Sequence, residues 1–139
     1  MSLKKQLILN HQALLVEDDP IQQKIIGTML SQLGYTIDIV GNAKDGICRL
    51  QNKIFNLVIL DLGLPDLPGE VVIDAVRKCT RNSDALIIVT SAHADKKNQQ
   101  RCLHFGANTV LVKPIYMENL EKVIYPSLQN INKHTEFTF

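Results

Sequence analysis

Short apolar runs alternate along the chain with longer segments in which apolar residues recur every three or four positions. A continuous apolar run is typical of a strand buried on both faces of a parallel sheet, and the wider spacing is typical of an amphipathic helix. The alternation therefore predicts an α/β fold in which each of five strands leads into a helix. The expected strands are residues 11–16, 35–40, 56–60, 85–89 and 110–112.

Capping residues and glycines indicate where the helices begin and end. Asp19 can cap a helix whose first residue is Pro20, and Gly34 follows its last apolar residue. Asn42 can cap the second helix, and Gly106 can end the fourth. The expected helices are residues 20–33, 43–50, 70–79, 95–105 and 116–124.

The two ends of the chain lack these patterns. We expect residues 1–10 to be an N-terminal extension, residues 11–127 to form one domain, and residues 128–139 to be a tail. Pro126 is expected to kink or end the last helix, because proline cannot donate the interior hydrogen bond. Residues 130–139 show no periodicity, so we expect them to fray.

Composition excludes several classes of protein. With 15 Lys and Arg against 14 Asp and Glu, the net charge of +1 provides no basic field for nucleic acid, so direct contact with nucleic acid is not expected. The apolar runs are too short to span a membrane and the N-terminus has no signal-peptide core, so we expect a cytoplasmic location without direct membrane contact. Cys48, Cys79 and Cys102 form no C-x-x-C pair, which argues against a disulfide framework and a zinc site.

Three of the expected strands end abruptly in charge. Glu17 and Asp18 follow the first strand, Asp61 follows the third and Lys113 follows the fifth. Because ligands gather outside the carboxyl ends of parallel strands, these side chains should meet at one edge of the sheet. Neighbouring carboxylates repel one another unless a cation lies among them, and oxygen ligands in an open site suit magnesium. This edge therefore favours a divalent metal and a phosphoryl group.

Ordinary structural roles stay open for each of these residues taken alone. Glu17 or Asp18 could cap the next helix, and Lys113 could be a solvated loop lysine. Thr90 and Ser91, which follow the fourth apolar run, could be turn or capping residues.

Five pieces of the sequence lie in order at the expected strand ends. The pieces are Val16-Glu17-Asp18-Asp19-Pro20, Leu60-Asp61-Leu62-Gly63-Leu64-Pro65-Asp66, Gly69, Val89-Thr90-Ser91-Ala92 and Val112-Lys113-Pro114. Together they resemble the receiver domain of two-component response regulators. The resemblance covers about residues 11–127 and implies a flavodoxin-like (βα)5 three-layer sandwich with a parallel five-stranded sheet in the order 2-1-3-4-5.

The resemblance implies a chemistry for the acidic edge. Asp61 would be the phosphoacceptor, taking a phosphoryl group from the phosphohistidine of a sensor histidine kinase or a histidine phosphotransfer domain. Asp18 would bind Mg2+ directly, Glu17 through water, and the Gly63 carbonyl would be a further ligand. The product would be the modified protein, so the chain would be a signalling module and not a turnover enzyme.

The resemblance also assigns the phosphoryl contacts and the switch. Thr90 and Lys113 would contact the phosphoryl oxygens, and movement of Thr90 would reshape the loop and surface beyond it. Many receivers carry an aromatic residue three positions before the lysine, where this chain has Val110, so an aromatic rotamer switch is not available.

Two further positions bear on how long the phosphoryl group would survive. Gly63 and Ala92 stand two residues after Asp61 and Thr90, where side chains would flank the path of the hydrolytic water. Neither can orient that water, so the resemblance implies slow-to-moderate loss of phosphate. His93 lies near the same place, and an exposed loop histidine is its ordinary interpretation.

Two other functions fit this sequence less well than a receiver. A metal-dependent aspartyl-phosphate phosphatase or phosphotransferase would need a second acid, and Asp61-Leu62-Gly63 has none two residues on. A nucleotide binder would need a Gly-rich loop after the first strand, where Glu17 and Asp18 stand instead. The sequence shows no effector domain or kinase core, so we expect either a free-standing receiver or a receiver cut from a larger protein. Its motifs slightly favour a receiver from a hybrid histidine kinase, which would lie in the cytoplasmic part of a membrane-anchored sensor.

Overall fold

The computed structural model describes residues 2–136, with side-chain environments for residues 2–128. Five parallel strands form one sheet in the order β2-β1-β3-β4-β5, which confirms the predicted fold and strand order. The expected second strand lies at the edge of the sheet. The strands are β1 (Gln12–Val16), β2 (Thr36–Val40), β3 (Leu57–Asp61), β4 (Leu86–Ser91) and β5 (Thr109–Val112).

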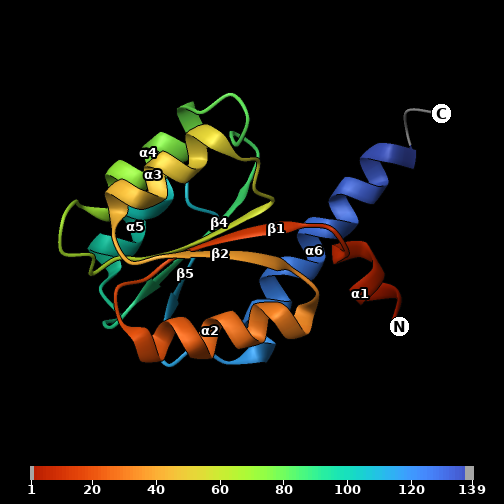
Figure 1. The fold of residues 1–139 in the computed structure, drawn as a ribbon, viewed down its shortest axis with the longest axis horizontal. Helices are drawn as coiled ribbons and strands as arrows, with labels where there is room; N and C mark the ends of the chain where they lie inside the picture. The colour runs from red at the N-terminus through yellow and green to blue at the C-terminus, as the bar shows by residue number, and fades with distance from the viewer. Residues whose placement is uncertain (1, 137–139) are drawn as a thin grey trace.

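Helices cover both faces of the sheet and complete a three-layer sandwich. Helices α3, α4 and α5 lie on one face, and α2 and α6 lie on the other (Figure 1). The helices are α1 (Leu3–Ile8), α2 (Pro20–Leu33), α3 (Ala43–Asn52), α4 (Gly69–Lys78), α5 (Lys96–Phe105) and α6 (Met117–Glu136). Among residues 2–136, no helix is both long enough and apolar enough to cross a membrane.

The continuous apolar runs are explained by a sheet that is covered by helices on both faces. In β3, Val58 and Leu60 point into the core beneath α3, α4 and α5, whereas Leu57 and Ile59 point into the core with α2 and α6. All four side chains are fully buried. Because successive strand residues face opposite sides, a strand with helices on both faces must be apolar at every position.

The predicted helix caps form as expected. Asp19 Oδ1 accepts the N–H of Ile21 at 3.0 Å with Pro20 as the first helical residue, and Asn42 Oδ1 accepts the N–H of Asp45 at 2.8 Å. Gly34 and Gly106 end α2 and α5 in the left-handed conformation, with φ of 113° and 119°.

An additional helix lies within the predicted N-terminal extension. Helix α1 is capped by Ser2, whose Oγ accepts the N–H of Lys5 at 3.2 Å, and its last residue, Ile8, is fully buried in the core. Ile8 also packs against Gly34, where an added Cβ would lie 3.6 Å from Ile8 Cγ2. Six residues are too few to show a helical period, which is why the sequence did not reveal this helix.

The last helix continues past the point where it was expected to end. Helix α6 runs through Pro126 to Glu136, so the expectation that residues 130–139 lack regular structure is wrong as far as Glu136, and residues 137–139 lie outside the described chain. Ile124 and Leu128, on either side of the proline, are both buried against the sheet. Their packing outweighs the single backbone hydrogen bond that proline removes.

Candidate functional site

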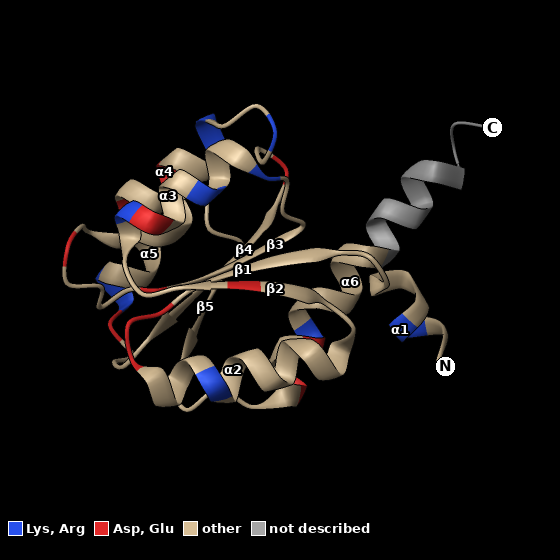
Figure 2. Cartoon of the chain, viewed as in Figure 1, with Lys and Arg blue, Asp and Glu red and all other residues tan. Residues whose placement is uncertain are grey.

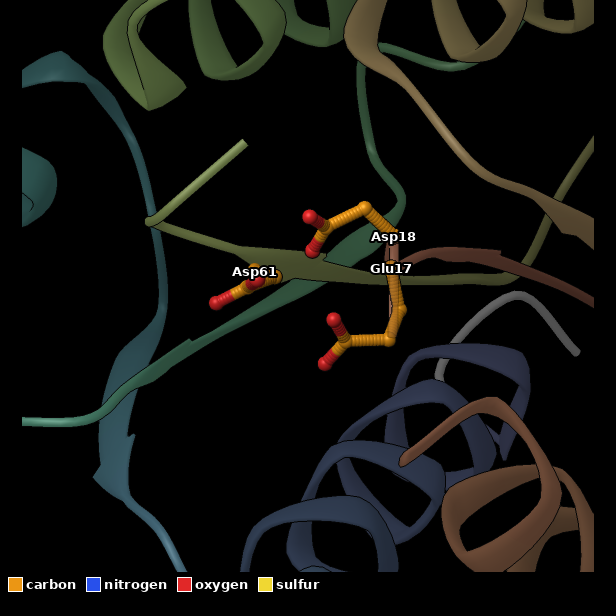
Figure 3. Close-up of side chains that lie close together, drawn as sticks. All are labelled: Glu17, Asp18 and Asp61. Carbon is orange, nitrogen blue, oxygen red and sulfur yellow. The ribbon is translucent and has the colours of Figure 1, made fainter. Parts of the chain in front are cut away.

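Three carboxylates meet at the edge formed by the carboxyl ends of the strands. Glu17 and Asp18 directly follow β1, Asp61 is the last residue of β3, and one ligand atom from each lies within 4.8 Å of the others (Figure 3). Figure 2 shows acidic segments at the same end of the sheet, where α2 begins. Glu17 is fully buried, Asp61 is 7% exposed and Asp18 is exposed, so the cluster opens to solvent on the side of Asp18.

The loop after β3 contacts the carboxylate of Asp61 through its backbone. The N–H of Gly63 donates to Asp61 Oδ1 at 3.2 Å, and the N–H of Leu62 donates to the carbonyl of Thr90 at 2.9 Å. A Cβ added to Gly63 would lie only 3.8 Å from Asp61 Oδ2. The backbone of Gly63 therefore lies beside the Asp61 carboxylate.

Lys113 connects two of the acids. Its Nζ donates to Glu17 Oε1 at 2.8 Å and to Asp61 Oδ1 at 3.2 Å. Burial lowers the pKa of Lys113, but the hydrogen bond to Glu17 and the charge of Asp61 outweigh this effect, so its pKa is raised and the ammonium group persists. Burial raises the pKa of Glu17, and Lys113 opposes that rise.

Thr90 presents a hydroxyl group without a partner. Its Cα pairs with that of Asp61 in the register of β3 and β4, and its side chain is 1% exposed. Among the described residues, Thr90 Oγ1 has no hydrogen-bond partner. A buried hydroxyl group without a partner is unusual because it has lost its hydrogen bonds to water, so this atom needs an explanation.

The neighbours of Thr90 have structural roles. Ser91 Oγ donates to the carbonyl of His93 at 2.9 Å and accepts its N–H at 3.2 Å, so Ser91 forms a turn, one of the roles left open for it. His93 itself is exposed. Val110, on the neighbouring strand β5, packs partly buried against the core beneath α5.

Two contacts of the site were not foreseen from the sequence. The ion pair between Lys113 and Glu17 joins residues 96 positions apart, whereas the sequence predicted only that their side chains would lie at the same edge of the sheet. Asp66, in the loop after β3, accepts two backbone N–H groups from the start of α3. Nothing local in the sequence indicates these partners, which lie 22 and 23 residues away.

The donor set at this edge fits a hard divalent cation. Three carboxylates face one lysine, so a negative charge is left uncompensated, and carboxylate and carbonyl oxygens are the ligands that magnesium prefers. Magnesium usually keeps several bound water molecules and completes its coordination with phosphate oxygens. The exposed position of Asp18 leaves room for both kinds of ligand.

Comparison with known proteins identifies one family. The family model for the response regulator receiver domain matches residues 13–125. The chain is 31% identical over 119 residues to the luminescence regulatory protein LuxO of Vibrio campbellii, a match that covers 86% of this chain and 26% of LuxO. The chain thus spans about a quarter of the length of this relative.

Solved structures agree in fold. A CheY-like response regulator receiver domain from Methanospirillum hungatei superimposes with a TM-score of 0.81 at 26% identity, covering 90% of this chain and 98% of that one. The receiver domain of a sensor histidine kinase from Pseudomonas aeruginosa, with magnesium coordinated in its active-site cleft, superimposes with a TM-score of 0.78 at 27% identity, covering 86% and 98%.

Proposed function

Because the chain belongs to the response regulator receiver domain family, which acts in two-component signalling, we propose that Asp61 is its phosphoacceptor. One observation carries the proposal: the Lys113 ammonium lies 3.2 Å from Asp61 Oδ1, and Thr90, whose hydroxyl group has no described partner, is paired with Asp61 in the register of the neighbouring strand. A cationic donor and a free hydroxyl group beside a carboxylate are what a phosphoryl group attached to that carboxylate needs.

The residues of the chain would act mainly by position and charge. An oxygen of Asp61 attacks the phosphorus, and the P–O bond forms as the P–N bond to the partner's histidine breaks, its electron pair leaving with the imidazole nitrogen. Lys113 would then exchange its contact with the Asp61 carboxylate for one with a phosphoryl oxygen. Thr90 would donate its hydroxyl hydrogen to another, which gives this buried atom its missing partner.

We propose that the metal is Mg2+, held by Asp18 and Asp61 directly, by the Gly63 carbonyl, and by Glu17 through water. The three clustered carboxylates and the magnesium in the related sensor kinase receiver support this assignment. When bound, the cation would offset the negative charge that gathers on the phosphoryl oxygens during transfer. Both carboxylate oxygens of Glu17 are already engaged, Oε1 by Lys113 at 2.8 Å and Oε2 by the N–H of Asp19 at 3.2 Å, which supports an indirect role for Glu17.

We further propose a sensor histidine kinase or a histidine phosphotransfer domain as the phosphoryl donor. In this role the chain is a module that is modified, and not an enzyme that turns over a substrate. Cys48, Cys79 and Cys102 are all free, which suits a reducing compartment and supports a cytoplasmic location. We place the receiver domain at residues 11–127. A phosphatase is not favoured, because the family match accounts for the acidic edge.

Intact-mass measurement tests the proposal. The protein is incubated with acetyl phosphate, with and without magnesium, beside the Asp61→Asn variant. As a matched control, Asp74→Asn removes an acid on α4 that pairs with Lys78 at 2.8 Å. We expect a gain of one phosphoryl group that needs magnesium, that persists in Asp74→Asn and that is absent from Asp61→Asn. Equal phosphorylation of Asp61→Asn and the unmodified chain would show that the acceptor lies elsewhere.

A further inference from the structure

The carboxylate of Asp66 joins two segments that are separate in the sequence. Asp66 lies in the loop of residues 62–68 between β3 and α4, and its Oδ1 and Oδ2 accept the N–H groups of Ala43 and Lys44, each at 2.9 Å. These are the first two residues of α3, whose N–H groups have no partner within the helix. The pKa of Asp66 lies below its usual value, mainly because of the hydrogen bond from Ala43, so the carboxylate stays ionised at neutral pH.

The start of α3 is a rigid support for this contact. Ala43 is fully buried, and Gly46, one turn further on, lies so close to β1 that an added Cβ would be 3.0 Å from Val16 Cγ2. Val16 directly precedes Glu17. Helix α3 is thus packed tightly against the strand end that carries two of the three acids.

The loop between Asp61 and Asp66 is held at both ends. At its start, the N–H of Leu62 donates to the carbonyl of Thr90 at 2.9 Å, and the N–H of Gly63 donates to Asp61. In its middle, the side chain of Leu64 is buried in the core. At its far end, Asp66 attaches it to α3 by two hydrogen bonds. The backbone of Gly63 lies between these attachments.

We propose that Asp66 is a positioning residue for phosphoryl transfer: its carboxylate ties the loop to α3 and thereby holds the backbone of Gly63 against Asp61. The inference rests on the proposed function, because it concerns the same site. Without the carboxylate, the loop would lose its attachment to α3, and Gly63 would lose a constraint on the backbone that donates its N–H to Asp61 and whose carbonyl would be a ligand of the metal. Residues that orient the ligands of a metal typically alter its affinity when they are changed.

The experiment compares two caps of the same helix. Asp66→Ala removes the carboxylate that reaches α3 from the loop. Asn42→Ala removes the side chain that caps the same helix by accepting the N–H of Asp45, and it leaves the loop unchanged. Magnesium affinity is measured by calorimetry, because the chain has no tryptophan to report binding. Stability is measured by urea unfolding, and the phosphorylation rate is measured against acetyl phosphate concentration at saturating magnesium.

We expect both variants to lower the urea midpoint, because both remove a helix cap. Only Asp66→Ala should weaken magnesium binding, by about tenfold, the lower end of the effect of residues that orient metal ligands. Only this variant should also shift the amide resonance of Gly63 in an NMR spectrum. Equal magnesium affinity in Asp66→Ala and Asn42→Ala would overturn the inference, because Asp66 would then be a helix cap and nothing more.

A second variant covers the case in which Asp66→Ala does not fold. Asp66→Asn keeps one of the two acceptor oxygens, so we expect it to weaken magnesium binding less than the alanine variant would. Unchanged magnesium affinity in Asp66→Asn, with a lowered urea midpoint, would again overturn the inference. If the unmodified chain binds magnesium and gains phosphate while the Asp66 variants match it, only this inference fails. If the unmodified chain does neither, the proposed function fails and the inference falls with it.

Discussion

The unpaired hydroxyl group of Thr90 gives the sharpest test of how the site works. Replacing threonine by valine keeps the branched shape of the side chain and exchanges the hydroxyl group for a methyl group of similar size. At most buried positions this change destabilises a protein, because the hydroxyl group has a partner. Thr90 Oγ1 has none among the described residues, and its side chain is 1% exposed. Thr90→Val should therefore stabilise the chain while phosphate is absent.

The size of the effect follows from the burial of this hydroxyl group. Leaving a buried hydroxyl group unpaired costs about 1–3 kcal/mol on mutational scales. Valine avoids that cost, so we expect the free energy of unfolding to rise by about 1–2 kcal/mol in Thr90→Val. The phosphorylated protein should respond in the opposite direction, because a hydrogen bond from Thr90 to a charged phosphoryl oxygen contributes about 1.5–3 kcal/mol.

Urea unfolding followed by far-ultraviolet circular dichroism measures both effects, since the chain has no tryptophan. Each variant is unfolded under two conditions. One sample contains no phosphate, and the other contains magnesium and beryllium fluoride, which mimics the phosphoryl group. Thr90→Ser keeps the hydroxyl group and serves as the control. We expect Thr90→Val to be more stable than the unmodified chain without the mimic and to gain less from adding it.

One result would refute this reasoning. If Thr90→Val is less stable than the unmodified chain without phosphate, its hydroxyl group has a partner in solution, and the unpaired atom is not a reserved contact for phosphate. A stabilised Thr90→Val that gains as much from the mimic as the unmodified chain would show that Thr90 does not contact the phosphoryl group. The measurement without the mimic thus tests whether the Thr90 hydroxyl group is unpaired, and the measurement with the mimic tests whether it contacts the phosphoryl group.

Three further predictions concern other parts of the chain. An added side chain at Gly63 would begin 3.8 Å from Asp61 Oδ2. Gly63→Asn combined with Ala92→Glu should therefore shorten the lifetime of the phosphorylated form by about tenfold or more. An unchanged rate of loss of the phosphorylated mass would contradict this prediction. Ile8→Ala should lower the free energy of unfolding by about 2–5 kcal/mol, because Ile8 is fully buried, and an effect no larger than that of a change at an exposed position would show that α1 does not belong to the core. Burial lowers the pKa of His11 below 6.5, so the unfolded chain gains a proton before the folded chain does, and stability should fall as the pH drops through about 6.5. Urea midpoints at pH 7.5 and 5.5 should differ less in His11→Gln, and an equal difference in both proteins would exclude His11 as the cause.

Much of the fold could be predicted because its signals are local. The run Leu57-Val58-Ile59-Leu60 is apolar at every position, which only a strand covered on both faces requires, and Asp19 with Pro20 forms a cap within three residues. The placement of the acids followed as well. Parallel strands all end at the same edge, so the charges of Asp18 and Asp61 had to approach each other once the strands were recognised.

The ends of the chain show where local signals fail. Helix α1 has six residues, too few for a period to appear, and its place is decided by Ile8 packing into the core. Pro126 should interrupt a helix on local grounds, yet α6 continues because Ile124 and Leu128 are both buried by the sheet. In both segments, tertiary packing contributes more than the intrinsic preference of the residues.

The sequence by itself determined the strands, the caps and the edge at which the chemistry gathers, because each depends on residues that are neighbours in the chain or on the common direction of parallel strands. Only the tertiary structure decided the partners of Lys113, the isolation of the Thr90 hydroxyl group and the attachment of Asp66 to α3. These depend on distances between side chains that are tens of residues apart, which no periodicity encodes. They are set by how the helices pack on the sheet.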